Sequence, residues 1–336
     1  MVDYEIFDLG DFALQQGATL RDAKLAYKTY GTLNADKSNV IVYPTWYSGQ
    51  HYDNEWLIGE GMALDPNQYF IIIPNMIGNG LSTSPSNNPA PYNKSRFPNV
   101  TFYDNVRAQH KLVTEKFGIE KIALVVGWSM GAGQTYQWGI SYPDMVERIF
   151  PFCGSARTSL HNIVFLEGVK AALQADAAWN GGWYDEPPTT GLRAVGRVYA
   201  GWGLSQAFYR EKVYLQIGYT SLEDFLVAFW EGFFLKKDAN NLLTMLWTWQ
   251  NGDISKTPGF DGDFEKALGA IKAKAIVMPA EFDLYFPPED NEYEVKYMPN
   301  AELRVIKSLW GHFAGGGAND ADTKFIDASI KELLAS

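Results

Sequence analysis

The sequence contains a single cysteine, Cys153, so the chain cannot form an internal disulfide. This cysteine follows a short apolar run, and we expect a small buried residue there rather than a nucleophile. No cluster of His and Cys has the spacing of metal ligands, and no window approaches 18 consecutive apolar residues. The acidic first residues lack the apolar stretch of a signal peptide. We therefore expect a cytoplasmic protein with no membrane span, no metal and no other cofactor.

Basic residues are also in short supply, with 28 Lys and Arg against 39 Asp and Glu, which gives a formal net charge of −11. Nucleic acids and anionic membranes bind basic surfaces, so the composition argues against both as partners. The hydrophobic fraction of 46% over 336 residues is ordinary for a globular protein with a large core. A small-molecule substrate remains compatible with this composition.

The segment Gly127–Gly131 has the pattern G-x-S-x-G, with Ser129 at its centre. Residues 121–126 predict a buried strand before it, and residues 133–142 predict a helix after it. In such a strand-to-helix turn the backbone is so tight that the positions two before and two after the serine must be nearly free of side chain. The turn exposes the serine hydroxyl and places the Met130 amide at a helix N-terminus, where it could hold an oxyanion.

Strands alternate with helices in the first 155 residues and again after residue 260, which predicts a mainly parallel sheet covered on both faces. An early antiparallel strand is expected at 19–32. Between residues 156 and 259 the alternation stops, and helical stretches rich in Trp follow. We expect residues 1–155 and 260–336 to form an α/β core, with 156–259 as a helical cap over the carboxyl edge of the sheet. Further strands and helices are predicted as follows: strands at 39–43, 69–74, 147–153, 273–279 and 302–306, and helices at 101–117, 288–297 and 319–334.

A serine nucleophile requires a base, and the order along the chain in this arrangement is Ser, then Asp or Glu, then His. Only His312 follows the last predicted strand, in Trp310-Gly311-His312, where the base is expected. The other three histidines, at positions 51, 110 and 161, lie before the strand-to-helix turn at Ser129, which is called the nucleophile elbow, or at the start of the cap. The sequence therefore predicts His312 as the base.

The carboxylate that orients the base should end the penultimate strand, where Asp283 fits and Glu281 is the nearest rival. A second oxyanion donor should come from a backbone amide in the loop after the strand at 39–43. Thr45, Trp46 and Tyr47 are the candidates, and the sequence alone leaves the choice open. Two other motifs predict no ligand site: Asp261-Gly-Asp263 has the pattern of a helix cap, and the glycines at 315–317 lie in a loop.

Several segments resemble the homoserine O-acetyltransferase-like branch of the α/β-hydrolases, over nearly the whole chain. The segments that carry the resemblance are Leu25-Ala-Tyr-Lys-Thr-Tyr-Gly31, Trp56-Leu-Ile-Gly-Glu-Gly-Met-Ala-Leu-Asp65, Phe97-Pro-Asn-Val-Thr-Phe-Tyr-Asp104, Gly127-Trp-Ser-Met-Gly-Ala-Gly-Gln134 and Asp283-Leu-Tyr-Phe-Pro287.

The resemblance implies an α/β-hydrolase fold, with a mostly parallel eight-stranded sheet, helices on both faces and an inserted helical cap. It supports Ser129, Asp283 and His312 as a catalytic triad, and it aligns Tyr47 with the family's oxyanion-loop residue, beside Met130. It also implies a homodimer packed through the cap.

The departures from the acetyltransferases concern substrate recognition. Those enzymes have an aspartate directly after the base histidine, and this aspartate resembles a group that receives the homoserine amine. This chain has Phe313 in its place. The glycine before their nucleophile is Trp128 here, a bulky wall beside the elbow. Arg197 matches an arginine that the family uses near the substrate carboxylate, but it could equally tie the cap down. With Trp46, these residues are the predicted substrate-binding positions.

We expect a serine hydrolase that cleaves a small acyl ester through an acyl-enzyme. The alternative is an O-acyltransferase that moves an acyl group from acyl-CoA to homoserine or another alcohol, and Phe313 argues against homoserine. A third hypothesis is a ligand-binding relative of the hydrolases whose turnover is incidental.

Overall fold

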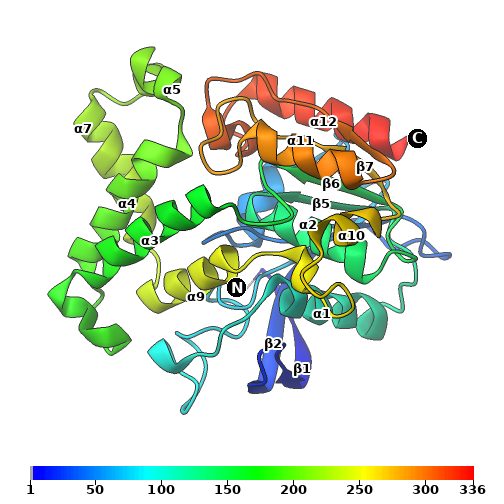
Figure 1. Ribbon diagram of the computed structural model, residues 1–336, viewed down its shortest axis with the longest axis horizontal. Helices are drawn as coiled ribbons and strands as arrows, with labels where there is room; N and C mark the ends of the chain where they lie inside the picture. Colours follow the sequence, from blue (N-terminus) through cyan, green and yellow to red (C-terminus); the bar gives the residue numbers. More distant parts are fainter. Residues whose placement is uncertain (1–2) are drawn as a thin grey trace.

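A computed structural model describes residues 3–336, which form one eight-stranded sheet with helices on both sides (Figure 1). The strands lie in the order β1-β2-β4-β3-β5-β6-β7-β8. From β4 to β8 across the sheet neighbouring strands run parallel, whereas β1 and β2 are antiparallel to their neighbours. The predicted mostly parallel eight-stranded sheet with helices on both faces is thereby confirmed.

The strands have the following bounds: β1 (Glu5–Ala13), β2 (Thr19–Tyr30), β3 (Val40–Val42), β4 (Phe70–Pro74), β5 (Leu124–Trp128), β6 (Arg148–Phe152), β7 (Lys274–Val277) and β8 (Ala301–Leu303). The α-helices have these bounds: α1 (Phe102–Lys111), α2 (Met130–Ser141), α3 (Leu160–Gln174), α4 (Thr189–Gly203), α5 (Gln206–Arg210), α6 (Val213–Gln216), α7 (Leu222–Phe225), α8 (Gly232–Phe234), α9 (Ala239–Gln250), α10 (Phe264–Gly269), α11 (Pro288–Tyr297) and α12 (Asp320–Leu334).

The central strands β4, β3 and β5 are buried on both faces because each is apolar throughout. Along β5, Leu124 and Val126 belong to one hydrophobic core, and Val125 between them belongs to the other. This alternation follows from the two-residue period of a strand. On the Val125 side α1, α2, α10 and α11 cover the sheet, and on the opposite side α12 does so, together with side chains from α3, α4 and α9.

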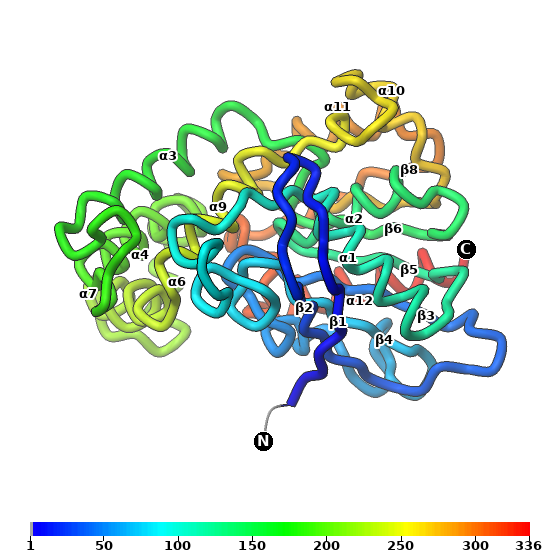
Figure 2. Tube along the Cα trace, turned by 90° about the horizontal axis from the view of Figure 1, so that it is seen from below, coloured from blue at the N-terminus to red at the C-terminus, as the bar shows by residue number. Residues whose placement is uncertain are grey.

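The N-terminal strand β1 was not predicted from the sequence. It pairs with β2 along most of its length to form a long hairpin, which crosses the front of the molecule in Figure 2. The pairing is irregular at Asp8 and at Gly10, and Gly10 has φ +61°. Such interruptions break the alternation of apolar and polar residues, which explains why the sequence pattern does not indicate a strand here.

The segment between β6 and β7 is helical, as predicted for residues 156–259. Its helices α3, α4 and α7 lie to one side of the sheet in both views (Figures 1 and 2). The chain enters and leaves this segment at adjacent points, because the Ile254 amide donates to the Ala156 carbonyl and Arg157 pairs with Asp253 in an antiparallel bridge. This closed attachment is compatible with an inserted cap, although the division into core and cap stays a prediction.

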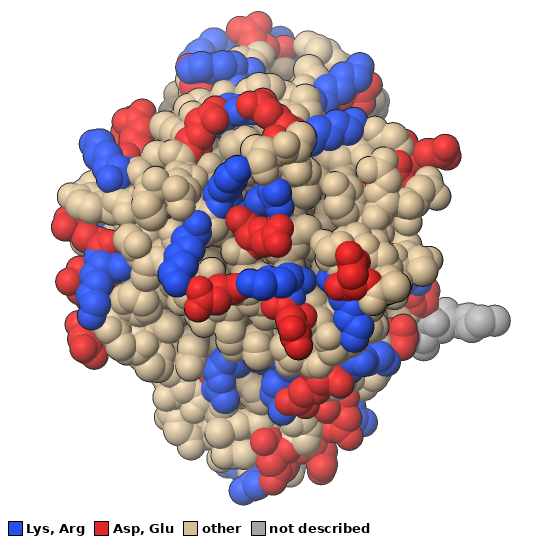
Figure 3. All heavy atoms as spheres, turned by 90° about the vertical axis from the view of Figure 1, so that its right-hand side faces the viewer, with Lys and Arg blue, Asp and Glu red and all other residues tan. Residues whose placement is uncertain are grey.

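Charges of both signs are interspersed on the face shown in Figure 3, with no large area of Lys and Arg alone. Within residues 3–336, no helix combines the length and hydrophobicity needed to span a bilayer.

Candidate active site

Ser129 lies at the junction of β5 and α2, with backbone angles of φ 57° and ψ −123°. Close backbone contacts require glycine two positions before and two positions after Ser129, at 127 and 131. A Cβ at Gly127 would lie 2.2 Å from the Gly131 carbonyl oxygen, and one at Gly131 would lie 2.8 Å from the Pro44 carbonyl oxygen. Both distances are shorter than any real Cβ contact, so the G-x-S-x-G pattern has the steric cause expected from the sequence.

His312 lies in the 3-10 turn Gly311–Gly315 and brings its imidazole to the serine. Its Nε2 is 3.0 Å from the Ser129 Oγ, and its Nδ1 is 2.7 Å from the Asp283 Oδ2. The turn requires glycine at 311, where φ is +57° and a Cβ would lie 2.9 Å from the Ser205 amide nitrogen. The structure thus brings the three predicted residues into one chain of hydrogen bonds.

Asp283 follows β7 and is held by the backbone after it. Its Oδ1 accepts hydrogen bonds from the amides of Tyr285, at 2.8 Å, and Phe286, at 3.1 Å. The carboxylate therefore faces the imidazole with its other oxygen. Because a carboxylate accepts hydrogen bonds, Nδ1 of His312 carries the hydrogen, and the Nε2 lone pair faces the serine hydroxyl. Ser129, His312 and Asp283 are all buried.

The loop after β3 packs against the N-terminus of α2. The Gln134 side chain donates to the Thr45 carbonyl at 2.9 Å, and Gly131 contacts the Pro44 carbonyl. Among the hydrogen bonds of residues 3–336, none is donated by the backbone N–H of Tyr47 or of Met130. Both amides are thus available to a ligand, and their role in an oxyanion hole stays a prediction.

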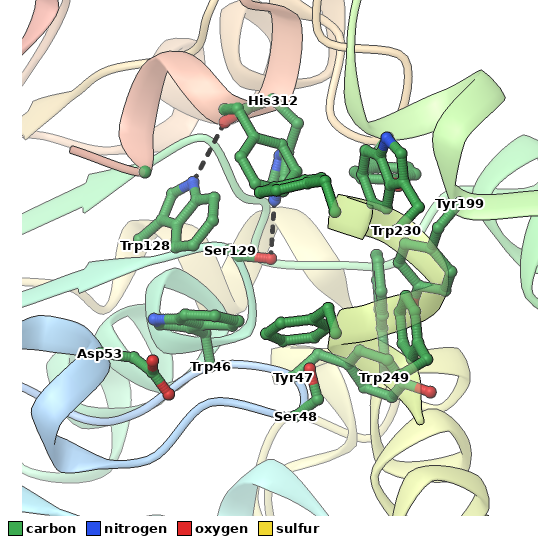
Figure 4. A pocket seen from close by; sticks show the side chains of 16 residues that line it. Trp46, Tyr47, Ser48, Asp53, Trp128, Ser129, Tyr199, Trp230, Trp249 and His312 are labelled. Carbon is green, nitrogen blue, oxygen red and sulfur yellow. Dashed lines mark hydrogen bonds between the residues drawn. The ribbon is translucent and has the colours of Figure 1, made fainter. Parts of the chain in front are cut away.

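Ser129 and His312 face a cavity of about 230 Å³ between the core and the helices that follow β6 (Figure 4). Aromatic side chains form most of its wall, and no Lys or Arg of the described chain lines it. The lining residues are Trp46, Tyr47, Ser48, Asp53, Trp128, Ser129, Tyr199, Phe229, Trp230, Phe233, Phe234, Trp249, Tyr285, His312, Phe313 and Gly316.

The sequence of residues 49–315 matches the family described as alpha/beta hydrolase fold. The chain belongs to this family. It is 43% identical to an ethyl acetate hydrolase of Pseudomonas veronii, over 99% of this chain and 96% of the relative. It is 33% identical to a homoserine O-acetyltransferase of Chlorobium chlorochromatii, over 90% of this chain and 88% of the relative.

A solved structure of the acetyl esterase MekB superposes on this α/β-hydrolase with a TM-score of 0.97, at 43% identity, over 99% of this chain and 97% of that one. These findings confirm the predicted resemblance to the α/β-hydrolases and to their homoserine O-acetyltransferase-like branch.

Three of the four residues predicted to bind substrate line the cavity of this hydrolase: Trp46, Trp128 and Phe313. Trp46 packs edge to face against Trp128, with ring centroids 4.8 Å apart, and Phe313 does so at 5.8 Å. The apolar ring of Phe313 therefore stands at the cavity, where it offers an amine no partner.

Arg197 does not reach the cavity. Its Nε donates to Glu231 at 2.6 Å, and its terminal nitrogens donate to Glu223. All three residues belong to the helical segment between β6 and β7. These contacts join α4 to residues 223 and 231 of the same segment, so they correspond neither to a partner for a substrate carboxylate nor to a tie between the cap and the core.

The Trp-rich helical segment was expected over the sheet, with some of its tryptophans at a substrate pocket, but the sequence did not indicate which residues line the cavity. Tyr199, Trp230 and Trp249 come from the helical segment, and Tyr285 follows Asp283 by two positions. Six buried polar atoms of the lining have no hydrogen-bond partner in residues 3–336: the indole nitrogens of Trp46, Trp230 and Trp249 and the hydroxyls of Tyr47, Tyr199 and Tyr285. Burial raises the pKa of each of these tyrosines. A high aromatic content was the only indication in the sequence.

The remaining histidines have structural contacts. His51 is buried and contacts Asn75, His110 stacks on Tyr142 with ring centroids 3.9 Å apart, and His161 packs against Trp202. The predicted order along the chain therefore selected His312, the histidine whose ring lies within hydrogen-bonding distance of Ser129.

The remaining motifs have structural roles in the described residues. Within the described residues, no group of three or more His, Cys, Asp or Glu is arranged to hold a metal. Asp263 caps α10 through the Lys266 amide, as predicted from the sequence. Cys153 is buried, and burial raises the pKa of its thiol, which is consistent with a packing residue.

Proposed function

We propose that this chain is a serine esterase that hydrolyses a short, uncharged carboxylic ester. The observation that carries the proposal is the chain of hydrogen bonds from Ser129 through His312 to Asp283, at 3.0 and 2.7 Å. A serine hydroxyl next to an oriented imidazole is the arrangement of an activated nucleophile.

In the proposed reaction, Nε2 of His312 takes the proton from Ser129 as Oγ attacks the ester carbonyl carbon. The carbonyl oxygen becomes an oxyanion, which the amides of Met130 and Tyr47 are proposed to hold. The C–O bond to the alcohol breaks, and the alcohol leaves with the proton from Nε2. A water molecule then gives a proton to Nε2 and attacks the acyl-enzyme, which releases the carboxylic acid and restores Ser129.

The cavity supports a small and uncharged substrate. Its volume of about 230 Å³ is below the roughly 300–1,000 Å³ of sites that take drug-sized ligands. A charged group buried in this aromatic lining would lose its hydration without gaining an ion-pair partner of positive charge. Relatives named as an ethyl acetate hydrolase and an acetyl esterase support the same substrate class.

Acyl transfer to an alcohol is the second candidate, because a homoserine O-acetyltransferase is 33% identical to the chain. The same acyl-enzyme would serve both reactions. Phe313 and the distant Arg197 argue against homoserine as the acceptor. Its carboxylate would meet no Lys or Arg in the cavity lining, and Asp53 is the one acidic residue of that lining that could face its ammonium. We therefore favour water as the acceptor.

The proposal is tested by the hydrolysis of a short activated ester by the wild type and by Ser129→Ala. We expect the variant to lose activity by about 10⁶-fold, the size of the loss when a serine nucleophile is removed from another triad enzyme. Activity that survives the change would remove Ser129 from the mechanism and would point to another nucleophile.

A second experiment separates hydrolysis from transfer. The enzyme is incubated with acetyl-CoA and homoserine, and in parallel with acetate to hexanoate esters, each with and without alcohol acceptors. We expect the free acid as the main product and the highest kcat/KM for the shortest acyl groups. Abundant O-acetylhomoserine would contradict the hydrolase proposal.

We further propose that the chain acts in the cytoplasm and forms a homodimer through the cap. Exposed apolar side chains on the helical segment support the second proposal, among them Leu160, which is 82% exposed, and Val164, which is 66% exposed. Light scattering of the wild type and of Leu160→Glu/Val164→Glu tests it, with a dimer expected for the first and a monomer for the second.

A further inference from the structure

Trp128 contacts His312 at two points. Its indole ring stacks on the imidazole, with ring centroids 5.0 Å apart and an angle of 24° between the planes. Its Nε1 donates a hydrogen bond to the His312 carbonyl oxygen at 3.2 Å (Figure 4). The residue before the nucleophile thus holds both the ring and the backbone of the base.

The indole is itself fixed on its other sides. Trp46 and Phe313 pack against it edge to face, and its side chain is buried. At Gly315, a Cβ would lie 2.5 Å from the indole Cδ1. The turn that carries His312 therefore needs a glycine at 315 in order to accept Trp128. A glycine at position 128 would have no ring to stack on the His312 imidazole.

The stacked geometry favours the charged form of the base. An aromatic face attracts a cation through its quadrupole, and this attraction is strongest for Trp and in a site shielded from water. In the proposed reaction His312 is neutral at the start and becomes an imidazolium when it takes the Ser129 proton. The indole then stabilises the transition state more than the ground state, which lowers the barrier.

The other groups around the imidazole do not depend on Trp128. Asp283 is hydrogen-bonded to Nδ1, and Tyr285, on the loop after β7, packs edge to face against the ring at 4.7 Å. Cys153 follows β6 and is close enough to Asp283 and Asp322 for both charges to act on its thiol. The carboxylate of Asp322, on α12, accepts a hydrogen bond from Ser308. These titratable groups keep their contacts when only the indole is replaced.

We propose that Trp128 is a positioning residue, which holds the His312 imidazole in line with Ser129 and stabilises its protonated form during the reaction. This inference rests on the proposed esterase function. It differs from the role of a wall for substrate, because a wall would act on substrate binding and not on the base.

The test compares Trp128→Leu, which keeps apolar bulk but removes the aromatic face, with Trp128→Phe, which keeps a face but removes the N–H. Trp183→Leu is the matched control, since Trp183 is exposed and lies outside the cavity lining. For each folded variant, kcat, KM and the pH profile of kcat/KM are measured with one short ester, and circular dichroism verifies the fold.

For Trp128→Leu we expect kcat to fall by about tenfold with a smaller change in KM, and the acidic limb of the pH profile to move down by about half to one pH unit, as loss of a cation–π contact would give. The limb moves down because the base gains a proton less readily. Trp128→Phe should recover most of kcat and the wild-type profile, and Trp183→Leu should match the wild type.

An unmoved pH profile in Trp128→Leu, with a change confined to KM, would overturn the inference and leave Trp128 as a wall. Equal loss in the Leu and Phe variants, without recovery by the aromatic ring, would overturn it as well. Failure of the esterase function itself is recognised separately, because Ser129→Ala would then keep the activity of the wild type.

Discussion

On the core side of the cavity, each side-chain polar atom of Ser129, His312 and Asp283 has a hydrogen-bond partner. The aromatic wall, to which both the core and the helical segment contribute, is built differently, because six of its buried polar atoms have no hydrogen-bond partner in residues 3–336. Directional hydrogen bonds orient the reacting atoms, whereas the wall is held by packing between rings. The difference indicates that the core side determines the chemistry and the wall determines which ester fits.

The largest effect that tests this comparison is expected for Asp283→Asn. An amide in this place can present its NH₂ to the imidazole and hold the wrong tautomer, so we expect kcat to fall by about 10³- to 10⁴-fold with little change in KM. Asp290→Asn is the control, since Asp290 lies in the first turn of α11 and its side chain has no part in the chain of hydrogen bonds. A loss of less than tenfold for Asp283→Asn would contradict the assigned role of the carboxylate.

A second prediction concerns the junction of the core and the helical segment. Glu294 is buried and accepts hydrogen bonds from the Ala156 amide and from the Tyr136 hydroxyl, each at 2.7 Å. Burial raises the pKa of Glu294 to about 7. Between the ordinary pKa of a glutamate and this value the folded state binds more protons than the unfolded state, so stability falls as the pH rises through that window.

Glu294→Gln removes this titration. The free energy of unfolding of the wild type, relative to the variant, should be lower at pH 8 than at pH 4.5 by about 3 kcal/mol, because each unit of pKa shift is worth 1.36 kcal/mol. Urea unfolding of both proteins at the two pH values measures the difference. An equal difference at both pH values would show that the carboxylate does not titrate as its burial requires.

The third prediction tests the wall. Tyr199→Phe removes a hydroxyl that lines the cavity and has no partner in the hydrogen bonds of residues 3–336, so we expect the free energy of unfolding to change by less than about 0.5 kcal/mol. Tyr184→Phe is the matched control, because its hydroxyl donates to Asp238 at 2.7 Å and accepts from the Asn240 amide. The free energy of unfolding of Tyr184→Phe should fall by about 1 kcal/mol. If both variants lose stability equally in urea unfolding, the Tyr199 hydroxyl has a partner and the contrast between wall and core is weaker than stated.

The smallest effect on activity is expected for Arg197→Met. Because Arg197 pairs with Glu223 and Glu231 and does not line the cavity, kcat/KM for a neutral ester should stay within about twofold of the wild type. The same comparison is made with an ester that carries a carboxylate. A selective rise in KM for the charged ester would place Arg197 at the substrate after all.

The core side of the site could be predicted from the sequence because each of its parts has a local cause. The turn at Ser129 requires glycine on both sides, and the positions of Asp283 and His312 follow from the ends of two strands. The elements nearest the site were predicted within a few residues, and α11 was predicted at 288–297, which are its bounds in the structure. The irregular strand β1 was missed because its bulges hide the alternation.

The wall could not be predicted in the same way. Tyr199 and Trp249 face the cavity because α4 and α9 pack against the core at a particular angle, and no local pattern encodes that angle. Arg197 illustrates the same limit, since its partners lie 26 and 34 residues further along the chain. A sequence motif near an arginine does not distinguish a substrate carboxylate from two glutamates of the same helical segment.

The central claim is that Ser129 carries the acyl group during the reaction. It is tested most directly by mixing the wild type with 4-nitrophenyl acetate, quenching with acid and analysing the digested protein by mass spectrometry. We predict a mass increase of one acetyl group on the peptide that contains Ser129, and none in Ser129→Ala. Rapid ester cleavage with no acetylated peptide at any quench time, or acetylation of a different residue, would contradict the account.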